Sequence, residues 1–247
     1  MPDPGFVHLH VHSSYSLLEG ALTIARLAEL AKGDRQPALA LTDTDNMFGA
    51  LEFSDKLAGA GIQPIIGCAL GVDFGDHEAP RHAGAHLLRH PRLVLLAASE
   101  DGYRSLMRLT SRAFLETPSG EAAHVKLAAL EGLTGLIALT GGPGGPLDLA
   151  LAAGQSELAA ARCARLVALF GDRLYVELQR HGMAEERQIE PALLDLAYAR
   201  ALPLVATNEP FYPRREDFEA HDALICIAEG RLIAESERRQ LSPEHYF

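Results

Sequence analysis

The stretch that decides the fold is residues 174–207, in which a strand pattern, a helix pattern and a second strand pattern follow one another. The sequence LYVEL at 174–178 is short and mostly apolar, as a buried strand is, and residues 184–201 have a helical pattern. The sequence LVAT at 204–207 predicts another strand. Neighbouring strands joined through a helix run parallel, because a crossover must return the chain to the same edge of the sheet. This stretch therefore predicts a βαβ unit.

The same alternation extends outward over the rest of the chain. Five more short runs rich in Val, Ile and Leu predict strands at 6–11, 38–42, 64–72, 93–97 and 135–140. Further helices are expected at 23–32, 46–60, 101–115, 157–170 and 216–229, with Thr23 and Asp101 as candidate caps. Seven strands alternating with helices predict an α/β fold, a mostly parallel sheet closed into a TIM-like (β/α)7 barrel. An open doubly wound sheet is the alternative, although no Gly-x-Gly-x-x-Gly follows the first strand.

The composition limits the classes of function. The chain has 247 residues, of which 48% are hydrophobic and 22% charged, as in a globular protein. Its net charge of −11 counts against a main role in gripping nucleic-acid phosphates, so we expect little direct DNA binding. Three widely separated cysteines, no signal peptide and no long apolar window predict a reduced, cytoplasmic chain without a membrane span.

Two loops interrupt the alternation. Residues 75–91 carry four histidines without an organised Cys or carboxylate spacing, which predicts a solvated loop. These histidines are His77, His82, His86 and His90. Residues 140–146 are rich in Gly and Pro but lack the Gly-Lys-Ser/Thr ending of a phosphate-binding loop, so we expect a tight turn there.

Candidate functional residues stand where the predicted strands end. His10 and His12 alternate along the first strand, so both side chains can reach one ion. The alternative is that they are two hydrogen-bonded polar residues at a strand end. Asp43 follows the second strand as a possible ligand or as a residue that orients one. His181 and Glu209 follow the last two strands and are further possible ligands.

Several motifs together resemble one known family. They are FVHLHVHS at 6–13, YSLLEG at 15–20, LTD at 41–43, PIIGC at 64–68, ELQRHG at 177–182, ATN at 206–208 and EAHD at 219–222. This series resembles the PHP (polymerase and histidinol phosphatase) domain, and more narrowly the version at the N-terminus of bacterial DNA polymerase III alpha subunits. The likeness covers essentially the whole chain. It implies a single PHP domain over 1–247 with a distorted seven-stranded barrel, an N-terminal fragment of a longer polymerase.

The resemblance also implies a set of metal ligands, which this chain keeps only in part. Metal-bearing members of the family hold up to three ions and hydrolyse phosphoesters. The retained or residual ligand positions are His10, His12, Glu19, Asp43, His181 and Glu209. Five family ligands are replaced, at Thr44, Ala69, Arg92, Gly142 and Phe211.

These replacements predict a hydrolytic site that has been lost. Ala, Gly and Phe cannot ligate a metal, and an inward Arg92 would place a positive charge where a cation belongs. We therefore expect no catalytic residues and at most one weakly bound divalent ion, Zn or Mn; Mg would serve only the full polymerase. The chain lacks the polymerase site itself. The partners implied by the resemblance are the remainder of the alpha subunit and the proofreading exonuclease (epsilon) subunit.

Two other functions stay open on the residues alone. One is a free-standing metal-dependent phosphoesterase, a phosphatase or 3′–5′ exonuclease, that recruits further ligands such as His82 or His86. The other is an unrelated barrel enzyme whose 141–145 loop binds phosphate through backbone N–H groups. The first requires tightly bound metal and turnover, and the second requires phosphate binding without metal.

Overall fold

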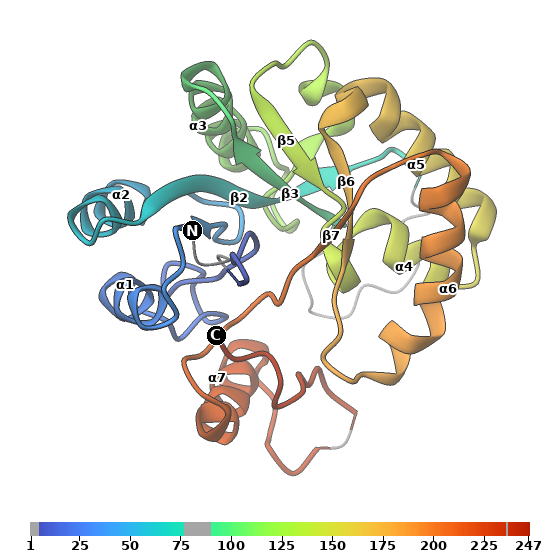
Figure 1. Ribbon diagram of the computed structural model, residues 1–247. Helices are drawn as coiled ribbons and strands as arrows, with labels where there is room; N and C mark the ends of the chain where they lie inside the picture. Colours follow the sequence, from blue (N-terminus) through green and yellow to red (C-terminus); the bar gives the residue numbers. More distant parts are fainter. Residues whose placement is uncertain (1–4, 77–89, 236) are drawn as a thin grey trace.

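The computed structural model describes residues 5–76, 90–235 and 237–247. The strands in these ranges form one curled sheet in the order β1-β2-β3-β5-β6-β7, with β4 paired to β2 (Figure 1). They are β1 (Ala38–Leu41), β2 (Gln63–Asp73), β3 (Arg92–Ala97), β4 (Val125–Lys126), β5 (Leu136–Leu139), β6 (Leu174–Leu178) and β7 (Leu204–Ala206). The curled sheet with its surrounding helices is a distorted TIM-like barrel, as the sequence predicts.

The helices lie around the outside of the curled sheet (Figure 1). They are α1 (Ile24–Gly33), α2 (Ala50–Gly59), α3 (Glu100–Leu115), α4 (Pro146–Ala152), α5 (Ser156–Phe170), α6 (Ala184–Ala199) and α7 (Phe218–Glu229). Thr23 caps α1 as predicted, since its hydroxyl accepts the Arg26 amide hydrogen at 3.2 Å. The predicted cap of α3 is wrong: Ser99 caps this helix, and Asp101 lies in its first turn. Helix α4 was not predicted.

The sheet is mostly parallel, as expected, but β3 departs from this by running antiparallel to both of its neighbours, β2 and β5. The described residues that connect β2 with β3 contain no helix, and antiparallel strands need no crossover. The other pairs of strands in the described sheet are parallel. Consequently Arg92, the first residue of β3, lies at the edge of the sheet where its antiparallel neighbours β2 and β5 end.

The predicted strand at 6–11 is not a strand, although it lies beside the sheet. The Ala40 amide donates to the His8 carbonyl at 2.9 Å, and the Thr42 amide donates to the Val11 carbonyl at 3.0 Å. On its other side, the His12 amide donates to the Pro210 carbonyl at 3.3 Å. This N-terminal segment therefore spans the open side of the sheet, between β1 and the residues that follow β7.

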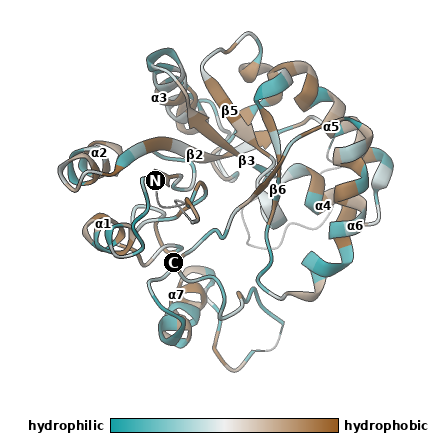
Figure 2. Ribbon diagram, viewed as in Figure 1, coloured by the Kyte–Doolittle hydropathy of each residue, from teal (hydrophilic) through white to brown (hydrophobic). Residues whose placement is uncertain are grey.

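Buried apolar side chains fill the space between sheet and helices. The largest cluster joins β2, β3 and β5 to α3 and α5, through residues such as Leu70, Leu95, Leu106 and Leu166. Each fully buried leucine contributes about 2 kcal/mol to folding. Figure 2 shows the strands mostly in the hydrophobic colours and the helices with mixed faces. None of the described helices is long and apolar enough to cross a membrane.

Candidate functional site

Two histidines and one glutamate converge between the N-terminal segment and the segment after β7. Glu209 Oε1 lies 3.2 Å from His12 Nε2 and 3.5 Å from His10 Nε2. Both imidazoles are buried, and the Glu209 side chain is 18% exposed. We call His10, His12 and Glu209 the central triad. All three are candidate ligands predicted from the sequence, and the structure brings them together.

Hydrogen bonds at the Nδ1 atom of each ring orient the two histidines. His10 Nδ1 lies 2.7 Å from Glu177 Oε1, and His12 Nδ1 lies 3.0 Å from Ser16 Oγ. The Ser16 hydroxyl gives its own hydrogen to Asp43 Oδ1 at 2.7 Å, so it accepts one from His12 Nδ1. Carboxylates and hydroxyls that hold Nδ1 in this way leave Nε2 to serve as a metal ligand.

The arrangement calls for a positive charge between the imidazoles and Glu209. With Nδ1 protonated, a neutral His12 ring turns the Nε2 lone pair toward the Glu209 carboxylate, 3.2 Å away. Two acceptors at that distance repel unless a proton or a metal ion lies between them. Burial lowers the pKa of His10, but the carboxylates of Glu177 and Glu209 outweigh it and the pKa is raised. The triad therefore fits either extra protons or one divalent cation.

Glu177, which the sequence analysis did not select, is the anchor of His10. Its side chain is fully buried and accepts the Gly141 amide at 2.9 Å, the Gln179 side-chain amide at 3.0 Å and the Thr207 hydroxyl. Burial raises the pKa of Glu177, but His10 and the Thr207 hydroxyl outweigh this effect, and the net shift is downward. The feature of the sequence that could have identified Glu177 is that it is the single charged residue in the otherwise mostly apolar run 174–178.

Asp43 orients the site instead of joining the triad. Its Oδ1 accepts the Ser13 amide and the Ser16 hydroxyl, each at 2.7 Å, and its Oδ2 accepts the Ser13 hydroxyl at 2.7 Å. With both oxygens held in this way, Asp43 fixes the turn that follows His12. Of the two roles the sequence left open, the geometry favours the orienting one.

Glu19 is held by an arginine rather than by the triad. Arg92 Nη2 lies 3.4 Å from Glu19 Oε1 and 4.0 Å from Asp45 Oδ2, and the Thr44 hydroxyl donates to Glu19 at 2.6 Å. Burial raises the pKa of Glu19, but Arg92 and the other neighbours outweigh it and bring the pKa to about 2. Arg92 thus points into the site and neutralises this candidate ligand.

His181 lies outside the triad as well. Its Nδ1 is 2.7 Å from Glu186 Oε1 and its Nε2 is 2.5 Å from the Asn208 carbonyl oxygen, so both ring nitrogens are engaged. The ring stacks on His245 with centroids 3.6 Å apart. Its position in the structure is that of a hydrogen-bonded turn residue.

The residues at three further positions where the resemblance implies a replaced ligand contact neighbouring side chains or backbone. Phe211 stacks on His12, with centroids 4.6 Å apart and planes 4° apart. Ala69 lies in an apolar cluster and bridges to Thr44. Gly142 has φ +55°, and a Cβ there would lie 2.6 Å from the Gln179 side-chain nitrogen. None of these three residues has a side-chain atom that could bind a second ion.

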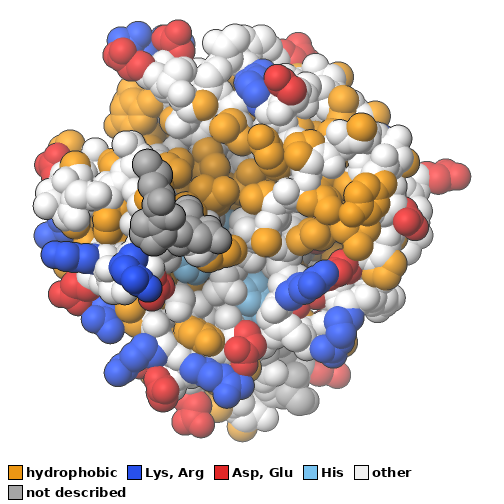
Figure 3. All heavy atoms as spheres, in the orientation of Figure 1, with side chains coloured by type: hydrophobic (Ala, Val, Ile, Leu, Met, Phe, Trp, Pro, Cys, Tyr) orange, Lys and Arg blue, Asp and Glu red, His pale blue; other side chains and the backbone are white. Residues whose placement is uncertain are grey.

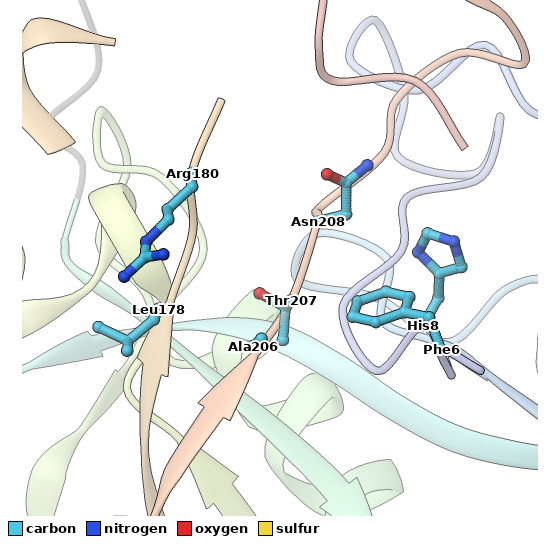
Figure 4. Close-up of a pocket in the computed structure, with 7 residues that line it drawn as sticks. All are labelled: Phe6, His8, Leu178, Arg180, Ala206, Thr207 and Asn208. Atoms are coloured by element: carbon cyan, nitrogen blue, oxygen red, sulfur yellow. The ribbon is translucent and has the colours of Figure 1, made fainter. Parts of the chain in front are cut away.

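A pocket of about 490 Å³ opens at the ends of β6 and β7 (Figure 4). Its lining comes from the N-terminal segment and the ends of β6 and β7: Phe6, His8, Leu178, Arg180, Ala206, Thr207 and Asn208. Burial lowers the pKa of His8 to about 4, so its ring is neutral near pH 7. Figure 3 shows histidine side chains near the centre of this face, surrounded by apolar and charged residues.

Comparison with known proteins places the chain in a family. The family model described as PHP domain matches residues 8–181. The chain is 46% identical over 246 residues to DNA polymerase III subunit alpha of Caulobacter vibrioides. It is 38% identical over 249 residues to the protein of the same name from Treponema pallidum. Each match covers 98% of this chain and 21% of the relative, so the chain spans about a fifth of these relatives' length.

A solved structure supports the fold. The chain superposes on an amidohydrolase from Chromobacterium violaceum with a TM-score of 0.52 and 16% identity. The superposition covers 82% of this chain and 86% of that one. At this identity the likeness concerns architecture alone. Together with the match over residues 8–181, these findings show that the chain belongs to the PHP domain family.

Proposed function

We propose that this chain is the PHP domain of a replicative DNA polymerase alpha subunit, with a structural and partner-docking role in DNA replication. The observation that carries the proposal is the Arg92–Glu19 pair inside the former ligand cluster. A guanidinium keeps its charge at all physiological pH values, so it competes permanently with a cation at that position. The similarity to polymerase alpha subunits over 98% of the chain supports the context.

We further propose that the central triad holds one divalent ion, Zn or Mn. Two imidazole nitrogens and one carboxylate oxygen are a donor set that suits these ions, and a fourth position stays open. An ion bound there would supply local positive charge and polarise an oxygen ligand. Hydrolysis with two or three ions needs additional ligands, and the positions of Ala69, Gly142 and Phe211 provide none. The ion would therefore cross-link the N-terminal segment to the segment after β7.

Exposed apolar side chains near α7 suit a protein partner. Leu17 and Leu18 are 69% and 52% exposed, and they line one pocket with Ile225 of α7. Leu232 and Ile233, just after α7, are 70% and 61% exposed. Apolar groups so exposed mark interaction surfaces when they gather. We call Leu17, Leu18, Leu232 and Ile233 the α7 face. We propose that the remainder of the alpha subunit covers this face. We also propose that the proofreading exonuclease subunit is a second partner of the domain.

The test of the lost activity is a phosphoesterase assay on the metal-loaded chain. We expect no turnover of p-nitrophenyl phosphate or of single-stranded DNA with Zn²⁺ or Mn²⁺ above the rate of the Glu209→Gln variant. The matched control is Glu131→Gln, which changes an exposed carboxylate away from the triad. Turnover that Glu209→Gln abolishes and Glu131→Gln leaves intact would contradict the proposal and favour a phosphoesterase.

A further inference from the structure

A second cluster of metal-ligating groups lies apart from the central triad. We propose that His90, Glu121 and His124 form a divalent-cation site of the zinc class. The Nε2 atoms of both histidines lie 3.7 Å from Glu121 Oε2, and the three ligand atoms all fall within 4.8 Å of one another. Two metal bonds of about 2.1 Å at a tetrahedral angle separate their ligand atoms by about 3.4 Å. The observed spacing is close to that value.

The ring of His124 is held in the tautomer that ligation requires. Its Nδ1 lies 2.9 Å from the Ala122 carbonyl oxygen, which can only accept a hydrogen bond. Nδ1 therefore carries the hydrogen, and in the neutral ring the lone pair is on Nε2. That lone pair faces the Glu121 carboxylate across a gap too long for a hydrogen bond. Backbone carbonyls that hold Nδ1 in this way are a regular feature of metal-bound histidines.

The surroundings of His90 add negative charge and bury the ring. Its side chain is 5% exposed, and its Nδ1 lies 3.9 Å from Asp73 Oδ1 while its Nε2 faces Glu121. The rings of His90 and His124 are 3.9 Å apart between centroids, at 35°. Two carboxylates thus face two imidazoles in a largely buried space, and a divalent cation would balance these negative charges.

The burial of His90 corrects the expectation of a solvated loop for this residue. The other three histidines of the 75–91 loop, His77, His82 and His86, lie outside the described residues. The cluster joins segments far apart in the chain, because Asp73 ends β2, His90 precedes β3, and residues 121–124 precede β4. It shares no residue with the central triad. A bound ion would tie the loop between α3 and β4 to the edge of the sheet.

The test uses Zn²⁺ alone as the probe and the whole chain without an affinity tag. Glu209→Gln serves as the background, so that the central triad does not mask the result. In that background we expect calorimetry to show one remaining Zn²⁺ per chain. Adding Glu121→Gln should weaken this binding at least tenfold, whereas adding Glu116→Gln, an exposed carboxylate paired with Arg112, should leave it unchanged. Equal affinity in the two double variants would overturn the proposal.

A second readout does not depend on the folding of the Glu121 variant. In the Glu209→Gln background, NMR of ¹⁵N-labelled histidine rings should show the Nε2 signals of His90 and His124 shifting on addition of Zn²⁺, while that of His181 stays fixed. Ring signals of His90 and His124 that do not move up to saturating Zn²⁺ would refute the site. Because the readout reports only these rings, the result is independent of the proposed function.

Discussion

Arg92 and Glu19 form an ion pair that is mostly buried. The side chains are 25% and 11% exposed, so their charges meet in a partly dry environment. The pKa of Glu19, about 2, is below its value of about 4.3 in an unfolded chain. A carboxyl with a depressed pKa contributes stability that is fully present above about pH 4.3 and is lost as the pH falls toward 2.

Removing the guanidinium should therefore cost stability in a pH-dependent way. We expect Arg92→Met to lower the free energy of unfolding by about 3 kcal/mol at pH 7, because it leaves a mostly buried carboxylate without its main partner. At pH 3 the loss should be smaller, since Glu19 can then accept a proton. Urea unfolding of the variant and the unchanged chain at pH 7 and at pH 3 measures the loss of stability at each pH.

The control for this prediction is Arg104→Met. Arg104 is 54% exposed and pairs with Glu100 on the surface of α3, so its loss should cost less than about 1 kcal/mol at either pH. A cost for Arg92→Met that is equally small, or that is larger at pH 3 than at pH 7, would contradict the charge assignment.

Motifs in the sequence indicate which residues lie near the site, but not which of them converge. Glu19, Asp43 and His181 stand in motifs as clearly as His10 and His12 do, yet among the described residues it is His10, His12 and Glu209 that come together. Glu177 contacts His10 across 167 positions, which no local pattern records. The pairing of His90 with Glu121 and His124 is hidden for the same reason.

At the scale of elements, the N-terminal segment shows why a strand pattern need not make a strand. The Val11 amide is bound by the Thr42 hydroxyl at 2.8 Å instead of by a backbone carbonyl. The same hydroxyl lies 3.1 Å from the Val11 carbonyl oxygen and donates to it. A side chain thus takes the place of a ladder bond, and period-two alternation in the sequence cannot reveal this exchange.

Replacing that hydroxyl should loosen the segment selectively. Thr42→Val keeps the shape but leaves the buried Val11 amide without its acceptor, at a cost of about 1–3 kcal/mol. We expect amide hydrogen exchange at Val11 to accelerate at least tenfold while exchange in α5 changes little.

Thr110→Val is the matched control for this variant. Thr110 is also buried, but its hydroxyl only donates to helix carbonyls of Leu106 and Met107, so no buried donor is orphaned. Unchanged exchange at Val11 in Thr42→Val, or equal effects in both variants, would show that the hydroxyl does not hold the segment.

The predicted helices and the other predicted strands form near their expected boundaries, with β6 matching at both ends, whereas β4 was not predicted. The direction of β3 and helix α4 could not be read from local pattern. Direction depends on whether a connection crosses the sheet, and the start of α4 lies within the Gly/Pro-rich run that predicts a turn. Pro146 at the first helical position is compatible with a helix, because its missing N–H would have had no partner there.

At the scale of the whole molecule, the charge and the exposed apolar groups point to the same kind of partner. A net charge of −11 opposes association with nucleic acid. The α7 face offers apolar contact area of the kind that protein interfaces bury. The domain is therefore expected to bind protein through this face.

We expect Leu232→Ser combined with Ile233→Ser to weaken binding to the remainder of the alpha subunit at least tenfold. The physical reason is the loss of apolar area that the interface would bury. Surface plasmon resonance with the separately produced remainder measures the affinity. Leu51→Ser, which changes a side chain that is 74% exposed on α2, is the control and should bind like the unchanged chain. Equal affinity for all three proteins would exclude this face.

The position of the N-terminal segment has a consequence for the order of folding during synthesis. Residues 6–12 are made early, yet they contact Pro210, and the His8 ring stacks on Phe247 with centroids 4.3 Å apart. Contacts of such long sequence separation form slowly and late. A ribosome must therefore release the chain as far as Phe247 before residues 6–12 can form all of these contacts. Until then the two histidines of the triad remain apart from Glu209, so the proposed ion could bind only once the fold is complete.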